Sequence, residues 1–221
     1  MNVTVYGDSI LKGVVFENGK YTVAHEWERK LTERFDLRVT NRSRFGSTLP
    51  KAMARIEKDS EVKTENEYAL LEFGGNDCDY DWAAIAAAPE EAHACKTPPE
   101  RFMDCYRRAI RLLRRSGRTP VLSTLPPINA ELYLSFLCRD GLSRENIIRW
   151  LGDVQRIYRW QENYSQMVEE VAREEGTPII DLRRPFLQDS RAPSALLCAD
   201  GIHPSRVGQG LIYRTFCAAM S

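Results

Sequence analysis

The 221-residue sequence has no apolar run of membrane-spanning length and no excess of either charge. Lys plus Arg and Asp plus Glu each number 31, so the formal net charge is zero. A balanced chain lacks the general attraction to polyanions that is typical of nucleic-acid-binding proteins. The sequence therefore argues against a nucleic-acid partner and against a membrane span. No coiled-coil heptads occur that would predict an oligomeric state.

Motifs that hold metals, disulfides or nucleotides are also missing. The six cysteines form no C-x-x-C pair and follow no regular spacing, which disfavours a metal site or a disulfide framework. Neither a phosphate loop nor the G-x-G-x-x-G pattern occurs. The strand-like Val3-Thr4-Val5-Tyr6 stands where a signal peptide would need an apolar stretch. We therefore expect a cytoplasmic protein that uses no metal and no cofactor.

Short apolar runs rich in β-branched residues alternate with helical patterns along the whole chain. The predicted strands are Asn2 to Tyr6, Leu37 to Asn41, Tyr68 to Phe73, Pro120 to Thr124 and Pro178 to Asp181. Such βαβ units form a parallel sheet with helices on both faces. The sequence predicts one α/β domain over residues 1–221, a three-layer sandwich whose flavodoxin-like, doubly wound parallel sheet has about five strands.

Capping residues and three-four apolar spacing mark the helices. The predicted helices are Ala24 to Arg34, Leu49 to Lys58, Glu100 to Arg115, a long one from Ser143 to Gly176 that Gly152 interrupts, and Ser205 to Ala219. Two segments, 78–99 and 126–142, are interpreted as insertions. Because both follow carboxyl ends of strands, the edge where open α/β sheets bind ligands, we expect them to act as substrate walls or lids.

A serine follows the first predicted strand directly, in Gly7-Asp8-Ser9. A turn there presents its hydroxyl at the carboxyl edge of the sheet, where it is available as a nucleophile. A serine in this position is more often the N-cap of the next helix, so the tripeptide alone favours a cap.

Asp200-Gly201-Ile202-His203-Pro204 lies just before the last predicted helix. An acid three residues ahead of a histidine, across a turn containing glycine, brings the carboxylate within reach of the imidazole Nδ1 and leaves Nε2 free to accept a proton. The alternative, a turn aspartate beside a structural histidine, is equally common. The other two histidines, His25 and His93, are interpreted as helix-surface residues.

Two further segments end predicted strands at the same edge. Gly74-Gly75-Asn76-Asp77 offers a neutral amide donor for a developing oxyanion, although these residues also make ordinary turns. In Arg44-Phe45-Gly46-Ser47, Gly46 has no Cβ, so a substrate oxygen can approach its backbone N–H closely. All four signals are predicted to lie at strand ends or in the last strand-to-helix loop, which turn chemistry alone does not explain.

Together these segments resemble the four ordered blocks of SGNH hydrolases, the GDSL-type lipases and esterases, and the resemblance spans nearly the whole chain. It implies a metal-free esterase whose partner is a small-molecule ester, in which Ser9 attacks the ester carbonyl, His203 is the base and Asp200 orients it. The oxyanion hole would be formed by the Ser9 N–H, the Gly46 N–H and the Asn76 side chain. Asp8 and Asp77 are interpreted as supports of the turns.

Specific residues also bear on three other classes of protein: α/β-hydrolases, cysteine hydrolases and non-catalytic binding modules. The nucleophile elbow of α/β-hydrolases reads G-x-S-x-G, but Leu11 stands where its second glycine belongs. Cys78 is the one cysteine placed for a cysteine hydrolase. A non-catalytic flavodoxin-like binding module also remains open.

The substrate is predicted less sharply, because pocket shape sets specificity. Short-chain acyl esters, including acetylated carbohydrates, are the first expectation, and lysophospholipids or thioesters are the second. Aromatic residues in or near the insertions either line a channel or belong to the core. They are Tyr80, Trp82, Tyr133, Phe136, Trp150 and Trp160.

Overall fold

A computed structural model describes residues 1–220, and within them five parallel strands form the central sheet. They are β1 (Asn2–Gly7), β4 (Arg38–Asn41), β5 (Glu67–Glu72), β6 (Arg118–Ser123) and β7 (Ile179–Ile180). Their spatial order, β4-β1-β5-β6-β7, is the flavodoxin-like order. The predicted fold class and all five predicted strands are therefore confirmed, although the last strand is shorter than expected.

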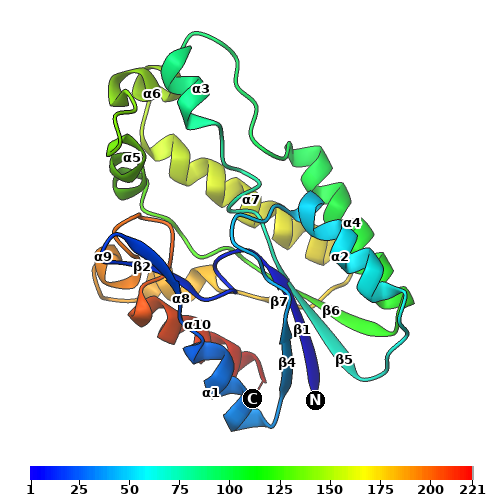
Figure 1. Ribbon diagram of the computed structural model, residues 1–221. Coiled ribbons are helices and arrows are strands. Elements are labelled where there is room, and N and C mark those ends of the chain that lie inside the picture. The colour runs from blue at the N-terminus through cyan, green and yellow to red at the C-terminus, as the bar shows by residue number, and fades with distance from the viewer. Residues whose placement is uncertain (221) are drawn as a thin grey trace.

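Helices cover both faces of the sheet (Figure 1). One face carries α2 (Leu49–Ser60), α4 (Pro99–Arg115) and α7 (Gln155–Glu174), whose apolar residues pack on Tyr6, Leu71 and Leu122. The other face carries α1 (Glu26–Phe35) and α10 (Arg206–Met220), whose apolar residues pack on Val5 and Leu70. Strands buried on both faces explain why the sequence shows continuous apolar runs rather than alternation.

The long helix predicted from Ser143 to Gly176 is broken where the sequence indicated. α6 (Arg144–Leu151) ends at Gly152, which takes φ +75°, and α7 begins at Gln155. Ser143 caps α6 by accepting a hydrogen bond from the Asn146 N–H at 3.2 Å. The break lets α6 turn away from the sheet while α7 continues along it (Figure 1).

A separate cluster of apolar residues lies above the carboxyl edge of the sheet. It joins α3 (Trp82–Ala87), α5 (Ala130–Cys138), α6 and the first turn of α7. We call these elements the cap. α3 falls in the segment 78–99 and α5 in the segment 126–142, so the two segments that the sequence sets apart lie side by side over the strand ends (Figure 1).

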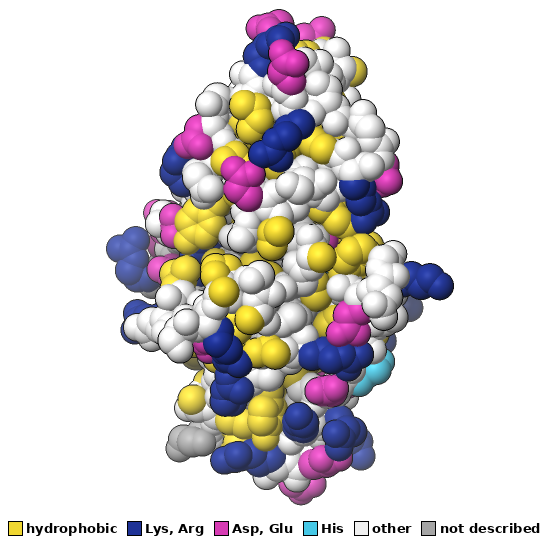
Figure 2. Space-filling model, turned by 90° about the vertical axis from the view of Figure 1, so that its left-hand side faces the viewer, with side chains coloured by type: hydrophobic (Ala, Val, Ile, Leu, Met, Phe, Trp, Pro, Cys, Tyr) yellow, Lys and Arg dark blue, Asp and Glu magenta, His cyan; other side chains and the backbone are white. Residues whose placement is uncertain are grey.

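A small hairpin of β2 (Val14–Glu17) and β3 (Lys20–Val23) is present that was not predicted from the sequence. Asn18 and Gly19 both have positive φ, 52° and 74°, as the two-residue turn of a tight hairpin requires. The Asn-Gly pair was the available signal. Figure 2 views the side on which β2, α5 and α9 (Pro193–Leu196) lie, and shows hydrophobic side chains gathered across its middle.

Candidate active site

Ser9 lies directly beyond the carboxyl end of β1. The chain turns at once, because the Lys12 N–H donates to the Asp8 carbonyl and the Val14 N–H to the Ser9 carbonyl. Ser9 is buried except for 7% of its surface, and its Oγ lies 2.9 Å from His203 Nε2. Residues 8–13 form turns and not a helix, so the helix-cap interpretation of Ser9 is wrong.

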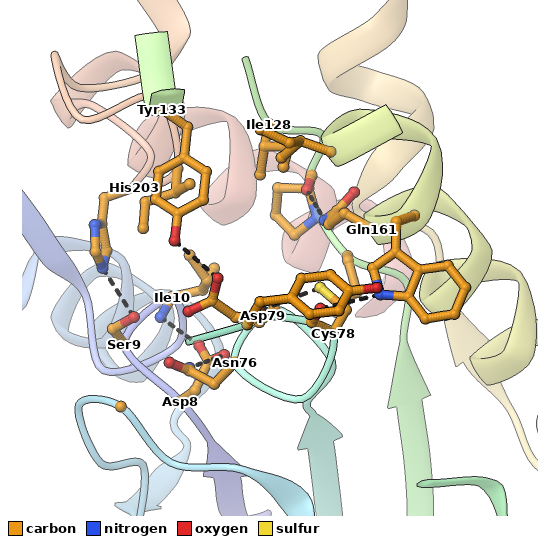
Figure 3. A pocket seen from close by; sticks show the side chains of 18 of the residues that line it. Asp8, Ser9, Ile10, Asn76, Cys78, Asp79, Ile128, Tyr133, Gln161 and His203 are labelled. Atoms are coloured by element: carbon orange, nitrogen blue, oxygen red, sulfur yellow. Dashed lines mark hydrogen bonds between the residues drawn. The ribbon is translucent and has the colours of Figure 1, made fainter. Parts of the chain in front are cut away.

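His203 is held by Asp200 in the way that the sequence spacing suggested. The two side chains meet at 2.6 Å between Nδ1 and Oδ2, and both are buried. The other carboxylate oxygen, Oδ1, accepts hydrogen bonds at 3.1 Å from the backbone N–H groups of Ile202 and His203. With its proton on Nδ1, the imidazole donates to the carboxylate, which leaves Nε2 free to accept the Ser9 proton. Figure 3 shows the contact between His203 and Ser9.

The predicted position of this loop needs one correction. Two short helices, α8 (Arg183–Gln188) and α9, stand between β7 and His203, so the loop joins α9 to α10 and does not follow a strand directly. A backbone pairing of Leu197 with Pro204 closes the loop at its base. His203 therefore reaches the sheet edge through a closed loop, whereas Ser9 and Asn76 reach it from strand ends.

The three residues predicted to form the oxyanion hole lie around one cavity. Ser9, Gly46 and Asn76 all line it. Gly46 takes φ +66° in a turn closed by the Ser47 N–H and the Arg44 carbonyl at 3.2 Å. Within residues 1–220, the backbone N–H groups of Ser9 and Gly46 donate to no protein acceptor. Donors left unpaired at one cavity are suited to an oxyanion.

Asp8 and Asp77 support the turns, as their motif positions suggested. Asp8 Oδ1 accepts the Ile10 N–H at 2.8 Å, and its Oδ2 accepts the Asn76 amide at 2.9 Å. Asp77 accepts the N–H of Leu49, the first residue of α2, at 3.0 Å. Burial raises the pKa of the Asp77 carboxyl to about 7. Asp77 thus links the loop after β5 to α2.

Two aromatic rings that the sequence did not assign pack against the catalytic candidate His203. The Tyr21 ring lies 5.3 Å from the imidazole, and the Phe45 ring stacks on it at 5.9 Å with an interplanar angle of 10°. Burial and the nearby Asp200 raise the pKa of Tyr21 to about 12. The Asn18-Gly19 signal predicts the hairpin that carries Tyr21, but no sequence signal predicts its contact with His203.

The cavity beside Ser9 has a volume of about 150 Å³ and extends under the cap. Five of the six aromatic residues noted in the sequence line it: Tyr80, Trp82, Tyr133, Trp150 and Trp160. Phe136 is the exception, because its ring packs on Phe16 at 5.2 Å and under the Arg139 guanidinium. The aromatic residues are therefore mainly a cavity wall, and not only core.

A carboxylate is fixed inside this wall. Asp79 Oδ1 accepts a hydrogen bond from the Tyr133 hydroxyl at 2.9 Å (Figure 3). It accepts a second from Trp82 Nε1 at 2.7 Å. Its Oδ2 pairs with Lys96 Nζ at 2.6 Å. The cavity therefore combines apolar ring surface with a few fixed polar groups, which is typical of a small-molecule site. His93, expected on a helix, lies in the neighbouring loop and contacts the Ala88 carbonyl.

A parallel sheet with Ser9, Gly46, Asn76 and His203 around one cavity is the arrangement implied by the resemblance to SGNH hydrolases. A family model described as the GDSL-like lipase/acylhydrolase family matches residues 5–211, and the chain belongs to this family. The predicted enzyme class, a hydrolase acting on ester bonds, is the class to which this family belongs. No curated protein matches the chain in sequence.

Solved structures of similar fold agree with this assignment. The acetylxylan esterase of Geobacillus stearothermophilus is 18% identical, with a TM-score of 0.69 over 100% of this chain and 94% of its own. The lipase/acylhydrolase of Enterococcus faecalis is 17% identical, with a TM-score of 0.66 over 99% and 94%. A putative SGNH hydrolase of Slackia heliotrinireducens is 16% identical, with a TM-score of 0.66 over 100% and 99%. At these identities the likeness shows the fold.

The helices between residues 1 and 220 include none that is both long and apolar enough to cross a membrane.

Proposed function

We propose that this protein is a serine esterase that hydrolyses carboxylic esters through an acyl-enzyme on Ser9. The observation that carries the proposal is the continuous chain of contacts from Asp200 through His203 to Ser9, at 2.6 and 2.9 Å. All three side chains are buried, yet Ser9 and His203 line an open cavity. A hydroxyl in contact with an oriented imidazole is the arrangement that activates a serine nucleophile.

In the first step, Ser9 Oγ forms a bond to the ester carbonyl carbon while its proton passes to His203 Nε2. The carbonyl π electrons move to oxygen, and this oxyanion is stabilised by the Ser9 N–H, the Gly46 N–H and the Asn76 amide. As the oxyanion collapses, the ester C–O bond breaks and Nε2 returns the proton to the leaving alcohol. Water then repeats the sequence on the acyl-enzyme, which releases the acid and restores the Ser9 hydroxyl.

Short-chain acyl esters, including acetylated carbohydrates, are the substrates that we propose. The cavity volume of about 150 Å³ is comparable to that of an apolar cavity that holds benzene. It therefore takes a short acyl group or part of one sugar ring. The chain of a lysophospholipid is several times larger, so this size disfavours the lysophospholipase alternative. The aromatic wall and the fixed Asp79 carboxylate favour a sugar as part of the substrate. Sugar rings stack on aromatic faces, and their hydroxyls donate hydrogen bonds to carboxylates.

The segments 78–99 and 126–142 are proposed as walls of this substrate site within one catalytic domain. α3 and α5 share an apolar cluster and place Trp82 and Tyr133 at the cavity. We further propose that the enzyme acts in the cytoplasm, on the basis of cysteines without disulfide or metal spacing.

Hydrolysis of p-nitrophenyl esters from two to twelve acyl carbons, and of acetylated xylo-oligosaccharides, tests this proposal. We expect turnover to fall sharply beyond short chains and to vanish in Ser9→Ala. Asn76→Ala should lower kcat by roughly 10²- to 10³-fold, since it removes one oxyanion donor. A folded wild-type protein that hydrolyses none of these esters, and whose Ser9 does not react with a fluorophosphonate, would refute the proposal and favour a binding module.

A further inference from the structure

Glu72 is a buried acid at the active site to which the steps above give no task. It ends β5, the residue is 1% exposed, and it is among the residues that line the cavity holding Ser9. In the parallel register it stands beside Gly7, the residue before Asp8. The carboxyl groups of Glu72 and Asp8 are within hydrogen-bonding reach of each other.

The hydrogen-bond donors around the pair are distributed unequally. Each oxygen of Asp8 accepts one N–H, from Ile10 at 2.8 Å and from Asn76 at 2.9 Å. Neither oxygen of Glu72 receives a well-formed hydrogen bond from residues 1–220. The Asp8 backbone N–H approaches the Glu72 carboxyl group. The nearby Tyr106 hydroxyl accepts a hydrogen bond from the Phe73 N–H and donates one to the Phe73 carbonyl. Burial raises the pKa of both carboxyls, but the donors to Asp8 offset part of this effect, so negative charge is less unfavourable on Asp8 than on Glu72.

The charges that face the pair favour the same distribution. Glu72 faces Asp8 and Asp77, both acidic, and the phenol of Tyr106 on α4, whereas Asp8 also faces His203. Burial and the Asp8 charge hold the pKa of Glu72 well above its usual range. Two ionised carboxylates this close repel each other, which favours a state in which the pair holds one proton.

We propose that Glu72 is a positioning residue that stays protonated, donates its O–H to the Asp8 carboxylate, and thereby fixes the Asn76 amide for oxyanion binding. An acceptor at Asp8 Oδ2 selects the NH₂ end of the Asn76 side chain. One amide hydrogen is bonded to Asp8, beside which Asn76 lies in Figure 3, and the second is left for the oxyanion. If Asp8 carried the proton instead, the amide could turn its oxygen to the site and repel the oxyanion. This role rests on the proposed esterase function.

The location of the proton is measurable without a substrate. Wild-type protein labelled with ¹³C at the Glu and Asp carboxyl carbons is titrated by NMR, with signals assigned from Glu72→Gln and Asp8→Asn. We expect the Glu72 signal to keep the chemical shift of a carboxylic acid through pH 7, while Asp8 shows that of a carboxylate. A Glu72 signal that titrates near its ordinary pKa would overturn the proposal.

The catalytic effect is tested by a double-mutant cycle with Asn76. Glu72→Leu should lower kcat for p-nitrophenyl acetate about 10- to 100-fold with little change in KM, because the donor is misplaced and not removed. In an Asn76→Ala background the same substitution should cost less than about threefold. Equal losses in both backgrounds would mean a merely structural role and would overturn the proposal.

Conservative and control variants complete the experiment. Glu72→Gln keeps an N–H donor toward Asp8, so it should restore most of the kcat lost in Glu72→Leu. Glu67→Gln, at the other end of β5 and paired with Thr4 and Arg118, is the matched control and should leave kcat unchanged. A Glu72→Gln variant as impaired as Glu72→Leu would refute the donor role. If the wild type has no Ser9-dependent esterase activity, the proposed function fails, and the catalytic role of Glu72 with it, whereas the NMR titration still decides where the proton lies.

Discussion

Asp200→Asn separates the two tasks of the acid beside His203. Asp200 Oδ1 accepts two backbone N–H groups at 3.1 Å, and only Oδ2 meets the imidazole. An asparagine keeps an oxygen at the first position and places an NH₂ group at the second. The loop is then still closed by its two backbone bonds, but His203 Nδ1 must accept a hydrogen bond where it previously donated one.

The exchange of donor and acceptor moves the imidazole proton to Nε2. That nitrogen, 2.9 Å from Ser9 Oγ, can then no longer take the serine proton. The same change in a Ser-His-Asp triad costs about 10⁴ in kcat, which corresponds to about 5.4 kcal/mol of transition-state free energy. We expect a loss of this size in kcat, while the free energy of unfolding changes by less than about 2 kcal/mol.

The assay is kcat for p-nitrophenyl acetate near pH 8, together with the rate of fluorophosphonate labelling and chemical denaturation. Asp104→Asn on the surface of α4, where the side chain is 76% exposed, is the matched control and should match the wild type. If Asp200→Asn retained more than about one tenth of the wild-type kcat, the proposed orientation of His203 by Asp200 would be wrong.

Three further changes test other parts of the structure. Gly201→Ala places a Cβ 2.6 Å from the Tyr133 backbone nitrogen, at φ +76°, and should lower the free energy of unfolding. The loss should exceed that of Gly176→Ala, where φ is +55° and the described residues leave the space open. Equal losses of unfolding free energy in chemical denaturation would contradict this. The pKa of Asp77 is about 7 in the folded protein against an ordinary 3.8, so the unfolded state loses this proton first as the pH rises. The free energy of unfolding should therefore fall between pH 4 and 8, by up to about 4 kcal/mol more than in Asp77→Asn. Parallel curves of unfolding free energy against pH for the wild type and Asp77→Asn would refute this. Trp150→Ala widens the cavity and should raise hexanoate relative to acetate ester hydrolysis about tenfold, and an unchanged ratio would exclude Trp150 from the acyl site.

The sheet could be predicted because its determinants are local. Tyr68 to Phe73 is a continuous apolar run that only Glu72 interrupts, and a strand buried on both faces needs such a run. The same locality explains the candidate site. A residue just beyond a parallel strand lies at the carboxyl edge of the sheet, so the order of strands brings Ser9 and Asn76 to one place.

What the sequence did not reveal depends on contacts between distant segments. Tyr21 touches His203 across 182 positions, and its role follows from where the hairpin packs and not from its own neighbours. Glu72 was a visible signal, a lone acid in an apolar strand, but its meaning depends on which groups surround it in the fold. The helices α8 and α9 are six and four residues long, too short for a helical period to be recognised.

The contact between the cap and the histidine loop limits which part of the cap can open. The Asn129 N–H donates to the Gly201 carbonyl at 2.8 Å, and the absence of a Cβ at Gly201 lets the start of α5 approach the loop. Moving α5 outward would break this bond beside Asp200 and His203 and disturb the triad. α3 and α6 are joined to each other through the Asn146 amide and the Ala86 carbonyl at 2.7 Å. An opening of the cap that left Asp200 and His203 undisturbed would therefore involve α3 and α6, with α5 held in place by its bond to the histidine loop.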